Sequence, residues 1–156
     1  MTASSPTQLV EYNIGDRDTR PWGEYEVTAV TKNAAGEEVC EKKITVLPKQ
    51  ILSLQSHELR RELWRVVSGE LTVVLNDRRM TLTAGQEINV PLGSIHAMAN
   101  TSDAPCVVFE RQEGTCREED IKRYLDAYGR GVEASDNPVV TASLAVYTQV
   151  MNEIKA

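Results

Sequence analysis

Apolar and polar residues alternate in short segments from Trp22 to Arg111. Turn-forming residues such as Gly, Pro, Asn and Asp interrupt the alternation about every 8 to 12 residues. This pattern is typical of an antiparallel sandwich or barrel and predicts an all-β fold. The expected strands are 25–30, 39–47, 51–57, 62–68, 71–75, 80–83, 87–90, 96–100 and 106–111.

After Arg111 the spacing of apolar residues changes to that of a helix. Thr115 and Glu118 have the spacing of a capping box, and Gly129 would end the helix. Between them, apolar residues lie at i, i+3, i+4 and i+7, namely Ile121, Tyr124, Leu125 and Tyr128. The pattern predicts a first amphipathic helix here.

A second helix is expected to begin at Pro138, with Asp136 or Asn137 as its cap. Its apolar stripe consists of Val140, Leu144, Tyr147, Met151 and Ile154. The stripe must be buried, either on the barrel or on a second subunit, and we expect a homodimer. The predicted organisation is an N-terminal arm over 1–19, a barrel over 20–114 and C-terminal helices over 115–156.

Composition narrows the class of partner. The chain has 156 residues, 41% hydrophobic and 26% charged, with a net charge of −6, which suits one domain and disfavours binding to nucleic acid or anionic membranes. No apolar run approaches the roughly 20 residues of a membrane span, and the first residues lack the basic and apolar regions of a signal peptide. We therefore expect a cytoplasmic protein with no nucleic-acid or membrane partner. The three cysteines share no CxxC spacing, which favours reduced thiols.

The sequence contains only two histidines, His57 and His96. Alternation in the strand 51–57 places Gln55 and His57 on one face, and Glu62 follows after a short break. Together with His96 these side chains offer two nitrogen and two oxygen donors. Such a set suits a divalent ion such as Zn²⁺, Mn²⁺, Co²⁺ or Fe²⁺.

The spacing of these residues follows two motifs. Gly85, Pro91, Gly93, His96 and Asn100 fit the pattern G(X)5PXG(X)2H(X)3N, and the earlier segment follows HXH(X)3-4E(X)6G with Gln55 in place of the first His and Lys49 in place of an opening Gly. These motifs resemble those of the cupin superfamily. The resemblance implies a double-stranded β-helix, or jelly-roll barrel, that binds one metal ion through Gln55, His57, Glu62 and His96.

Further segments narrow the resemblance. The stretches RPWG at 20–23, LSLQSH at 52–57, RRELW at 60–64, ERQEG at 110–114 and YGR at 128–130 look like those of the type II phosphomannose isomerase cupin. This domain commonly forms the C-terminal half of mannose-1-phosphate guanylyltransferases and also occurs alone. The match covers residues 20–130.

The resemblance implies interconversion of mannose 6-phosphate and fructose 6-phosphate through an enediol, with a divalent metal, zinc first and Mn, Co, Fe or Ni as alternatives. The candidate catalytic residues are Glu62, Glu110 and Arg60, and the sequence does not decide which is the base. The candidates for binding the sugar phosphate are Arg20, Arg111, Arg130 and Trp64, with core packing as the alternative for Trp64.

The sequence departs from the isomerase pattern where relatives usually carry extra histidines, at Glu58, Leu59 and Leu63. Two further interpretations therefore stay open. One is a metal-binding cupin of other chemistry, such as a lyase, epimerase or dioxygenase. The other is a non-catalytic sugar-binding cupin.

Overall fold

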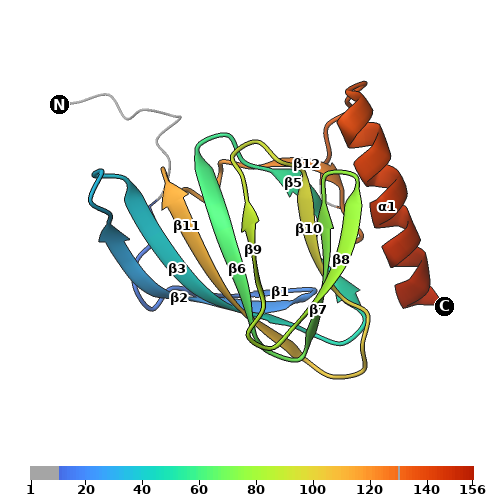
Figure 1. The fold of residues 1–156 in the computed structure, drawn as a ribbon, viewed down its shortest axis with the longest axis horizontal. Helices are drawn as coiled ribbons and strands as arrows, with labels where there is room; N and C mark the ends of the chain where they lie inside the picture. Colours follow the sequence, from blue (N-terminus) through green and yellow to red (C-terminus); the bar gives the residue numbers. More distant parts are fainter. Residues whose placement is uncertain (1–10, 130) are drawn as a thin grey trace.

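The computed structural model describes residues 11–129 and 131–156, which form two facing antiparallel sheets and one helix (Figure 1). The first sheet has the order β1-β2-β3-β11-β6-β9 and the second β12-β5-β10-β7-β8, with β4 paired to β10. The strands are β1 (Arg17–Arg20), β2 (Gly23–Lys32), β3 (Glu38–Val46), β4 (Gln50–Ile51), β5 (Leu54–Ser56), β6 (Arg60–Ser68), β7 (Glu70–Leu75), β8 (Arg78–Thr83), β9 (Glu87–Val90), β10 (His96–Asn100), β11 (Cys106–Gly114) and β12 (Lys122–Leu125), and the helix is α1 (Pro138–Lys155).

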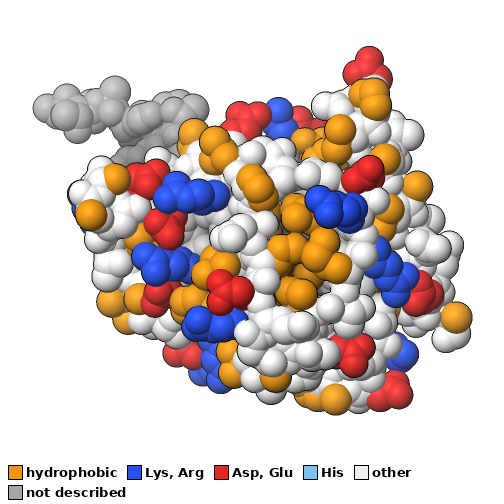
Figure 2. Space-filling model, in the orientation of Figure 1, with side chains coloured by type: hydrophobic (Ala, Val, Ile, Leu, Met, Phe, Trp, Pro, Cys, Tyr) orange, Lys and Arg blue, Asp and Glu red, His pale blue; other side chains and the backbone are white. Residues whose placement is uncertain are grey.

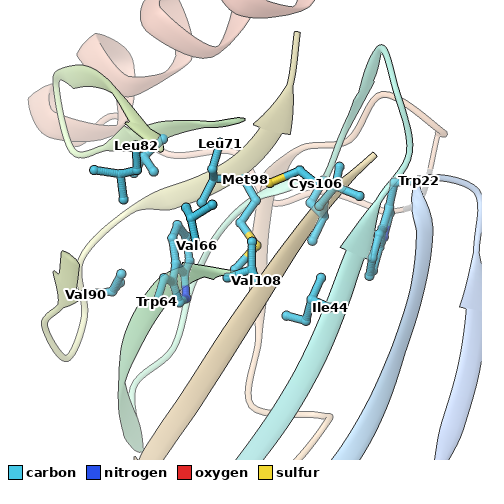
Figure 3. Close-up of a cluster of buried hydrophobic side chains, with 13 residues drawn as sticks. Trp22, Ile44, Trp64, Val66, Leu71, Leu82, Val90, Met98, Cys106 and Val108 are labelled. Atoms are coloured by element: carbon cyan, nitrogen blue, oxygen red, sulfur yellow. The ribbon is translucent and has the colours of Figure 1, made fainter. Parts of the chain in front are cut away.

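The space between the sheets is apolar at one end. Trp22, Ile44, Trp64, Val66, Leu71, Leu82, Val90, Met98, Cys106 and Val108 converge there from both sheets (Figure 3). Gly69 lets β6 turn into β7 beside this core: its φ is +82°, and a Cβ atom would lie 2.5 Å from the carbonyl oxygen of Pro105. The glycine of the first motif is therefore required by the backbone.

Strand β11 lies between β3 and β6 and fixes which side chains face the interior. Glu110 pairs with Lys42 of β3 and Trp64 of β6, and Gln112 pairs with Glu62. Because cross-strand partners share a face of the sheet, these polar residues all lie inside the barrel. The described barrel thus has a polar interior next to its apolar core.

The predicted second helix is present as α1, with Asn137 as its cap and Pro138 at its start. It covers the outer face of the second sheet (Figure 1). Val140, Tyr147 and Val150 are buried against that sheet, and the Tyr147 hydroxyl donates a hydrogen bond to the carbonyl oxygen of Leu52 at 2.7 Å. The apolar stripe is therefore buried on the barrel, and the homodimer stays a prediction.

The predicted first helix is wrong. Lys122–Leu125 forms β12, which pairs with β5 and is bulged between Arg123 and Leu125. The exposed edge of β5 offers a ladder of backbone hydrogen bonds, and this tertiary pairing overrides a local pattern of only four apolar positions. Two C-terminal helices are thus replaced by one helix and one strand.

The surface is mixed in character. In the view of Figure 2, hydrophobic side chains gather between β9 and β8, and basic and acidic side chains alternate around them. Across the residues that the structure describes, no helix is both long and apolar enough to span a membrane.

Candidate metal centre

Three buried side chains, His57, Glu62 and His96, meet inside the barrel. Each offers one ligand atom, and these atoms all lie within 4.8 Å of one another. His57 follows β5, Glu62 is an inward residue of β6, and His96 begins β10. Two sheets therefore bring together residues that are up to 39 positions apart in the sequence.

Backbone carbonyl groups orient both imidazoles. The Nδ1 atom of His57 lies 2.5 Å from the carbonyl oxygen of Asp120, and Nδ1 of His96 lies 3.1 Å from that of Ser94. A carbonyl only accepts hydrogen bonds, so both Nδ1 atoms carry the proton and both Nε2 atoms present a lone pair to the interior. The lone pair of His57 Nε2 accepts a hydrogen bond from Nη2 of Arg60 at 3.3 Å, so Arg60 would have to release it for a metal ion to bind there. Burial lowers the pKa of His57 to about 3 and also lowers the pKa of His96. Both rings are neutral at neutral pH, the form that binds metals.

Glu62 lies between the two imidazoles. Its Oε2 is 3.4 Å from Nε2 of His57, and its Oε1 is 3.8 Å from Nε2 of His96. Oε1 also accepts a hydrogen bond from the Trp64 indole at 2.9 Å, and Oε2 accepts one from Nε of Arg60 at 3.0 Å. Burial acts to raise the pKa of Glu62, but the nearby His57 and Arg60 outweigh it and hold this pKa well below its usual value.

Gln55 supplies the fourth predicted ligand. It is the direct cross-strand partner of His96 and lines the same interior cavity as Glu62. Nε2 of His96 is buried without a hydrogen-bond partner in the described part of the chain, and a buried imidazole lone pair is costly unless something binds it. Two nitrogen and two oxygen donors with an unsatisfied Nε2 thus fit one divalent ion.

Next to these ligands the barrel encloses a cavity of about 80 Å³. Its wall is unusually rich in charge for a barrel interior. The basic residues are Arg20, Lys42, Arg60 and Arg123, and the acidic ones are Glu62, Glu110 and Glu118. Lys42 and Arg123 were not identified as cavity residues from the sequence. Lys42 could have been found, because it occupies an inward position of β3 between Cys40 and Ile44. Arg123 could not, because it lies in the stretch predicted to be a helix.

Glu110 is a cavity carboxylate that is not a predicted metal ligand and whose pKa is raised. It is buried, and its Oε1 accepts a hydrogen bond from Nε2 of Gln112 at 2.7 Å. Burial first, and then the negative charge of Glu62, raise the pKa of Glu110 to about 7. A carboxyl group with this pKa both takes and returns a proton at neutral pH.

The predicted binders of the sugar phosphate lie in different places. Arg20 lines the cavity and pairs with Glu118 at 3.1 Å. Trp64 is only 1% exposed and packs edge-on against His96, so its ring is not available for stacking on a ligand. Arg111 faces the opposite side of β11 from Glu110 and pairs with Glu113, so the structure does not bring it to the cavity. Arg130 lies outside the described residues.

The three positions without the expected histidines lie away from the cavity. Glu58 and Leu59 are exposed, and Glu58 pairs with Lys122 at 3.0 Å. Leu63 points out of the barrel because it alternates with the inward Glu62. Replacing histidine at these positions therefore leaves the described cavity wall intact.

Comparison with known proteins gives the family. Residues 8–126 match the family described as "Mannose-6-phosphate isomerase C-terminal". The chain belongs to this family. It is 40% identical over 115 residues to the alginate biosynthesis protein AlgA of Pseudomonas aeruginosa, covering 73% of this chain and 23% of that protein. It is 38% identical over 121 residues to the mannose-1-phosphate guanylyltransferase ManC of Salmonella typhimurium, covering 77% and 24%.

The chain thus spans about a quarter of the length of the curated relatives it matches. Among solved structures, a protein with a double-stranded β-helix domain from Klebsiella pneumoniae superposes with a TM-score of 0.53 at 17% identity, over 79% of this chain and 96% of that one. This likeness confirms the predicted barrel fold of the isomerase-family chain.

Proposed function

We propose that this chain is a metal-dependent sugar-phosphate isomerase that interconverts mannose 6-phosphate and fructose 6-phosphate. The observation that carries the proposal is that a set of candidate metal ligands and a possible proton-transferring carboxyl group lie next to each other at one cavity. A set of metal ligands with both Nε2 lone pairs turned inward lies beside Glu110, a carboxyl group whose pKa is about 7. Membership of the family supports the choice of substrate.

Gln55, His57, Glu62 and His96 would hold the ion, with zinc the first choice and Mn, Co, Fe or Ni as alternatives. When bound, the ion supplies a positive charge that stabilises the negative charge developing on the sugar oxygens. The neutral imidazoles and the ionised Glu62 are already in the protonation states that ligands need. Glu62 is held by Trp64 and Arg60, which favours the role of ligand over that of base.

Glu110 would move the proton. As a carboxylate it takes the proton from C2 of the open-chain aldose. The electron pair of that bond forms the C1=C2 double bond of the enediol, and the π pair of the C1 carbonyl moves onto O1, which takes a proton from water. Glu110 then returns its proton to C1 while O2 gives its own proton to water and becomes the ketone oxygen, so that no proton is gained or lost overall. Gln112 holds the carboxyl group through its 2.7 Å hydrogen bond.

A second candidate is a metal-binding cupin of other chemistry, such as a lyase, epimerase or dioxygenase, or a non-catalytic sugar-binding protein. The size of the cavity favours those members of this group that act on a ligand smaller than a hexose phosphate: about 80 Å³ is well below the roughly 300 Å³ at which pockets for drug-sized ligands begin. Binding of a hexose phosphate would require side chains such as that of Arg20 to move outward.

The test gives metal-loaded protein mannose 6-phosphate and measures fructose 6-phosphate. We expect turnover in the wild type and a loss of about 10²-fold or more in Glu110→Gln, the usual size of a general-base contribution, with metal content unchanged. Glu113→Gln, on the outward face of the same strand, is the matched control and should keep full activity. Absence of turnover in the wild type would refute the proposal and favour the second candidate.

A further inference from the structure

Lys42 is a buried cation without a direct ion pair among the described residues. It is 5% exposed and lines the interior cavity, and the charges of Glu110 and Glu118 act on it only from beyond ion-pair distance. Its ammonium group lies over two aromatic rings, 3.9 Å from the centroid of Tyr12 and 4.4 Å from that of Tyr25. The rings fix the position of the ammonium group and stabilise it, but they do not neutralise its charge.

The carboxylates nearest in the fold are bonded to other groups. Glu110, the cross-strand partner of Lys42, bonds to Gln112. Glu118 accepts hydrogen bonds from the hydroxyl of Tyr12 at 2.5 Å and from Arg20 at 3.1 Å. Within the described residues neither carboxylate forms a direct ion pair with Lys42, although both act on it electrostatically. The N–H donors of its ammonium group can therefore turn to an anionic group in the cavity.

We propose that Lys42, with Arg20 beside it at the cavity wall, forms a subsite that binds the phosphate group of a phosphorylated sugar. Arg20 is less buried than Lys42, with 31% of its side chain exposed, and it pairs with Asp18 at 2.9 Å and Glu118 at 3.1 Å, so it would share its charge between these carboxylates and the phosphate. Its guanidinium group lies 6.0 Å from the ring of Tyr25, which also contacts Lys42. The two cations therefore flank one aromatic ring, one of them deep and the other toward solvent.

The placement relative to the metal centre fits one extended ligand. Lys42 is on β3 and Glu62 on β6, with β11 between them, so the two strands are about 10 Å apart at the usual strand spacing. Both side chains line the same cavity. A six-carbon sugar with its phosphate on the last carbon has the length to reach from one to the other. The subsite would hold the phosphate while the oxygens of C1 and C2 lie at Gln55, His57, Glu62 and His96.

The experiment measures binding of three probes to the metal-loaded full chain: inorganic phosphate, mannose 6-phosphate and mannose. The variants are Lys42→Gln, Lys42→Arg and, as matched control, Lys43→Gln, which changes the exposed neighbour on the same strand. We expect Lys42→Gln to weaken phosphate and mannose 6-phosphate by about 10-fold or more, the effect of losing one hydrogen bond to a charged group. Binding of mannose should stay unchanged, and Lys42→Arg should keep most of the affinity.

Equal phosphate affinity in Lys42→Gln and wild type would overturn the inference, as would loss of phosphate binding on chelation of the metal alone. An equal loss of affinity for mannose and mannose 6-phosphate would also overturn it, because Lys42 would then only shape the barrel. If Lys42→Gln does not fold, a wild-type affinity ratio of mannose 6-phosphate to mannose near one is the refuting result. The identity of the sugar phosphate rests on the proposed function, but the binding of phosphate at Lys42 does not. If the wild type shows no turnover and its phosphate binding still depends on Lys42, the isomerase activity is refuted and the phosphate subsite is not.

Discussion

The imidazole of His57 donates a hydrogen bond from Nδ1 to the carbonyl oxygen of Asp120, 2.5 Å away. The side chain of Asp120 in turn accepts hydrogen bonds from the backbone N–H groups of Glu58 and Leu59, at 3.1 and 3.0 Å. One residue thus fixes both the ring of a candidate metal ligand and the loop that follows it. The link joins the end of β5 to the segment between β11 and β12.

Asp120→Ala should weaken metal binding without removing a ligand. Loss of the two carboxylate hydrogen bonds frees the loop and with it the carbonyl group that orients His57. Loss of such an orienting partner typically costs 10- to 100-fold in metal affinity, and we expect a decrease of about that size for Zn²⁺, measured by competition with a chromophoric chelator. Asp103→Asn, at a side chain that is 96% exposed, should bind as the wild type does. A wild-type affinity in Asp120→Ala would show that the ring needs no such support.

The role of Asp120 illustrates what the sequence predicted and what it did not. Alternation of apolar residues predicted most strands of the barrel, because each buries one face against the facing sheet. The spacing of His57, Glu62 and His96 predicted a cluster that could hold a metal ion, and the structure brings the three side chains together, because the cluster depends on positions along strands. Asp120 lies in the stretch between Thr115 and Gly129 that is predicted to be helical. Its partners lie 61 and 62 positions away, so no local pattern reveals its role.

The cavity wall was harder to predict for the same reason. Its charges come from β1, β3, β6, β11 and β12 and from the segment before β12, so their neighbourhood depends on the order of strands in the sheets. Arginines such as Arg111 were chosen by motif, although alternation along β11 turns Arg111 outward when Glu110 faces inward. Lys42 follows the same kind of alternation along β3, so its inward position could have been predicted from the sequence.

Gln55→His should strengthen metal binding. An amide oxygen is a weak neutral ligand compared with an imidazole, and Gln55 is the cross-strand partner of His96 at the cavity. We expect the Zn²⁺ affinity to rise by about 10-fold or more, equivalent to roughly 1.4 kcal/mol. Gln50→His, at a residue whose amide oxygen is bonded to Tyr128, adds a histidine elsewhere and should leave the affinity unchanged. Unchanged affinity in Gln55→His as well would remove Gln55 from the ligand set.

The pH dependence of the stability of the metal-free protein should report the protonation states of the buried His57, His96 and Glu110. Between about pH 5 and 6 the unfolded chain protonates His57, with an ordinary pKa of about 6.5, while the folded chain keeps it neutral, with a pKa of about 3. Unfolding then takes up one proton at His57, and His96, whose pKa is also lowered by burial, adds to this uptake. Glu110 opposes this, because its folded pKa of about 7 keeps a proton that the unfolded chain, with a carboxyl pKa of about 4.3, releases.

The protons of His57 and Glu110 nearly cancel, so the remaining uptake at His96 makes the free energy of unfolding rise with pH by no more than about 1.4 kcal/mol per unit. In Glu110→Gln the opposing proton is absent, and we expect the slope to be steeper by about 1.4 kcal/mol per unit. Urea unfolding at several pH values in the presence of a chelator measures both slopes. Carboxylates with a lowered pKa, such as Glu62, affect the curve only below this range. Parallel curves for the two proteins would mean that Glu110 is ionised throughout.

Restoring histidine at Glu58, Leu59 and Leu63 should not increase isomerase activity. The isomerase pattern that the sequence resembles has histidines at these positions, but here Glu58 and Leu59 are exposed and Leu63 faces out of the barrel. Substitutions at such positions usually change free energies by no more than about 0.5 kcal/mol, or about twofold. The kcat/KM of the triple variant for mannose 6-phosphate should therefore stay within about twofold of the wild type. A gain of an order of magnitude or more would show that the loop around Glu58 folds over the cavity when substrate binds.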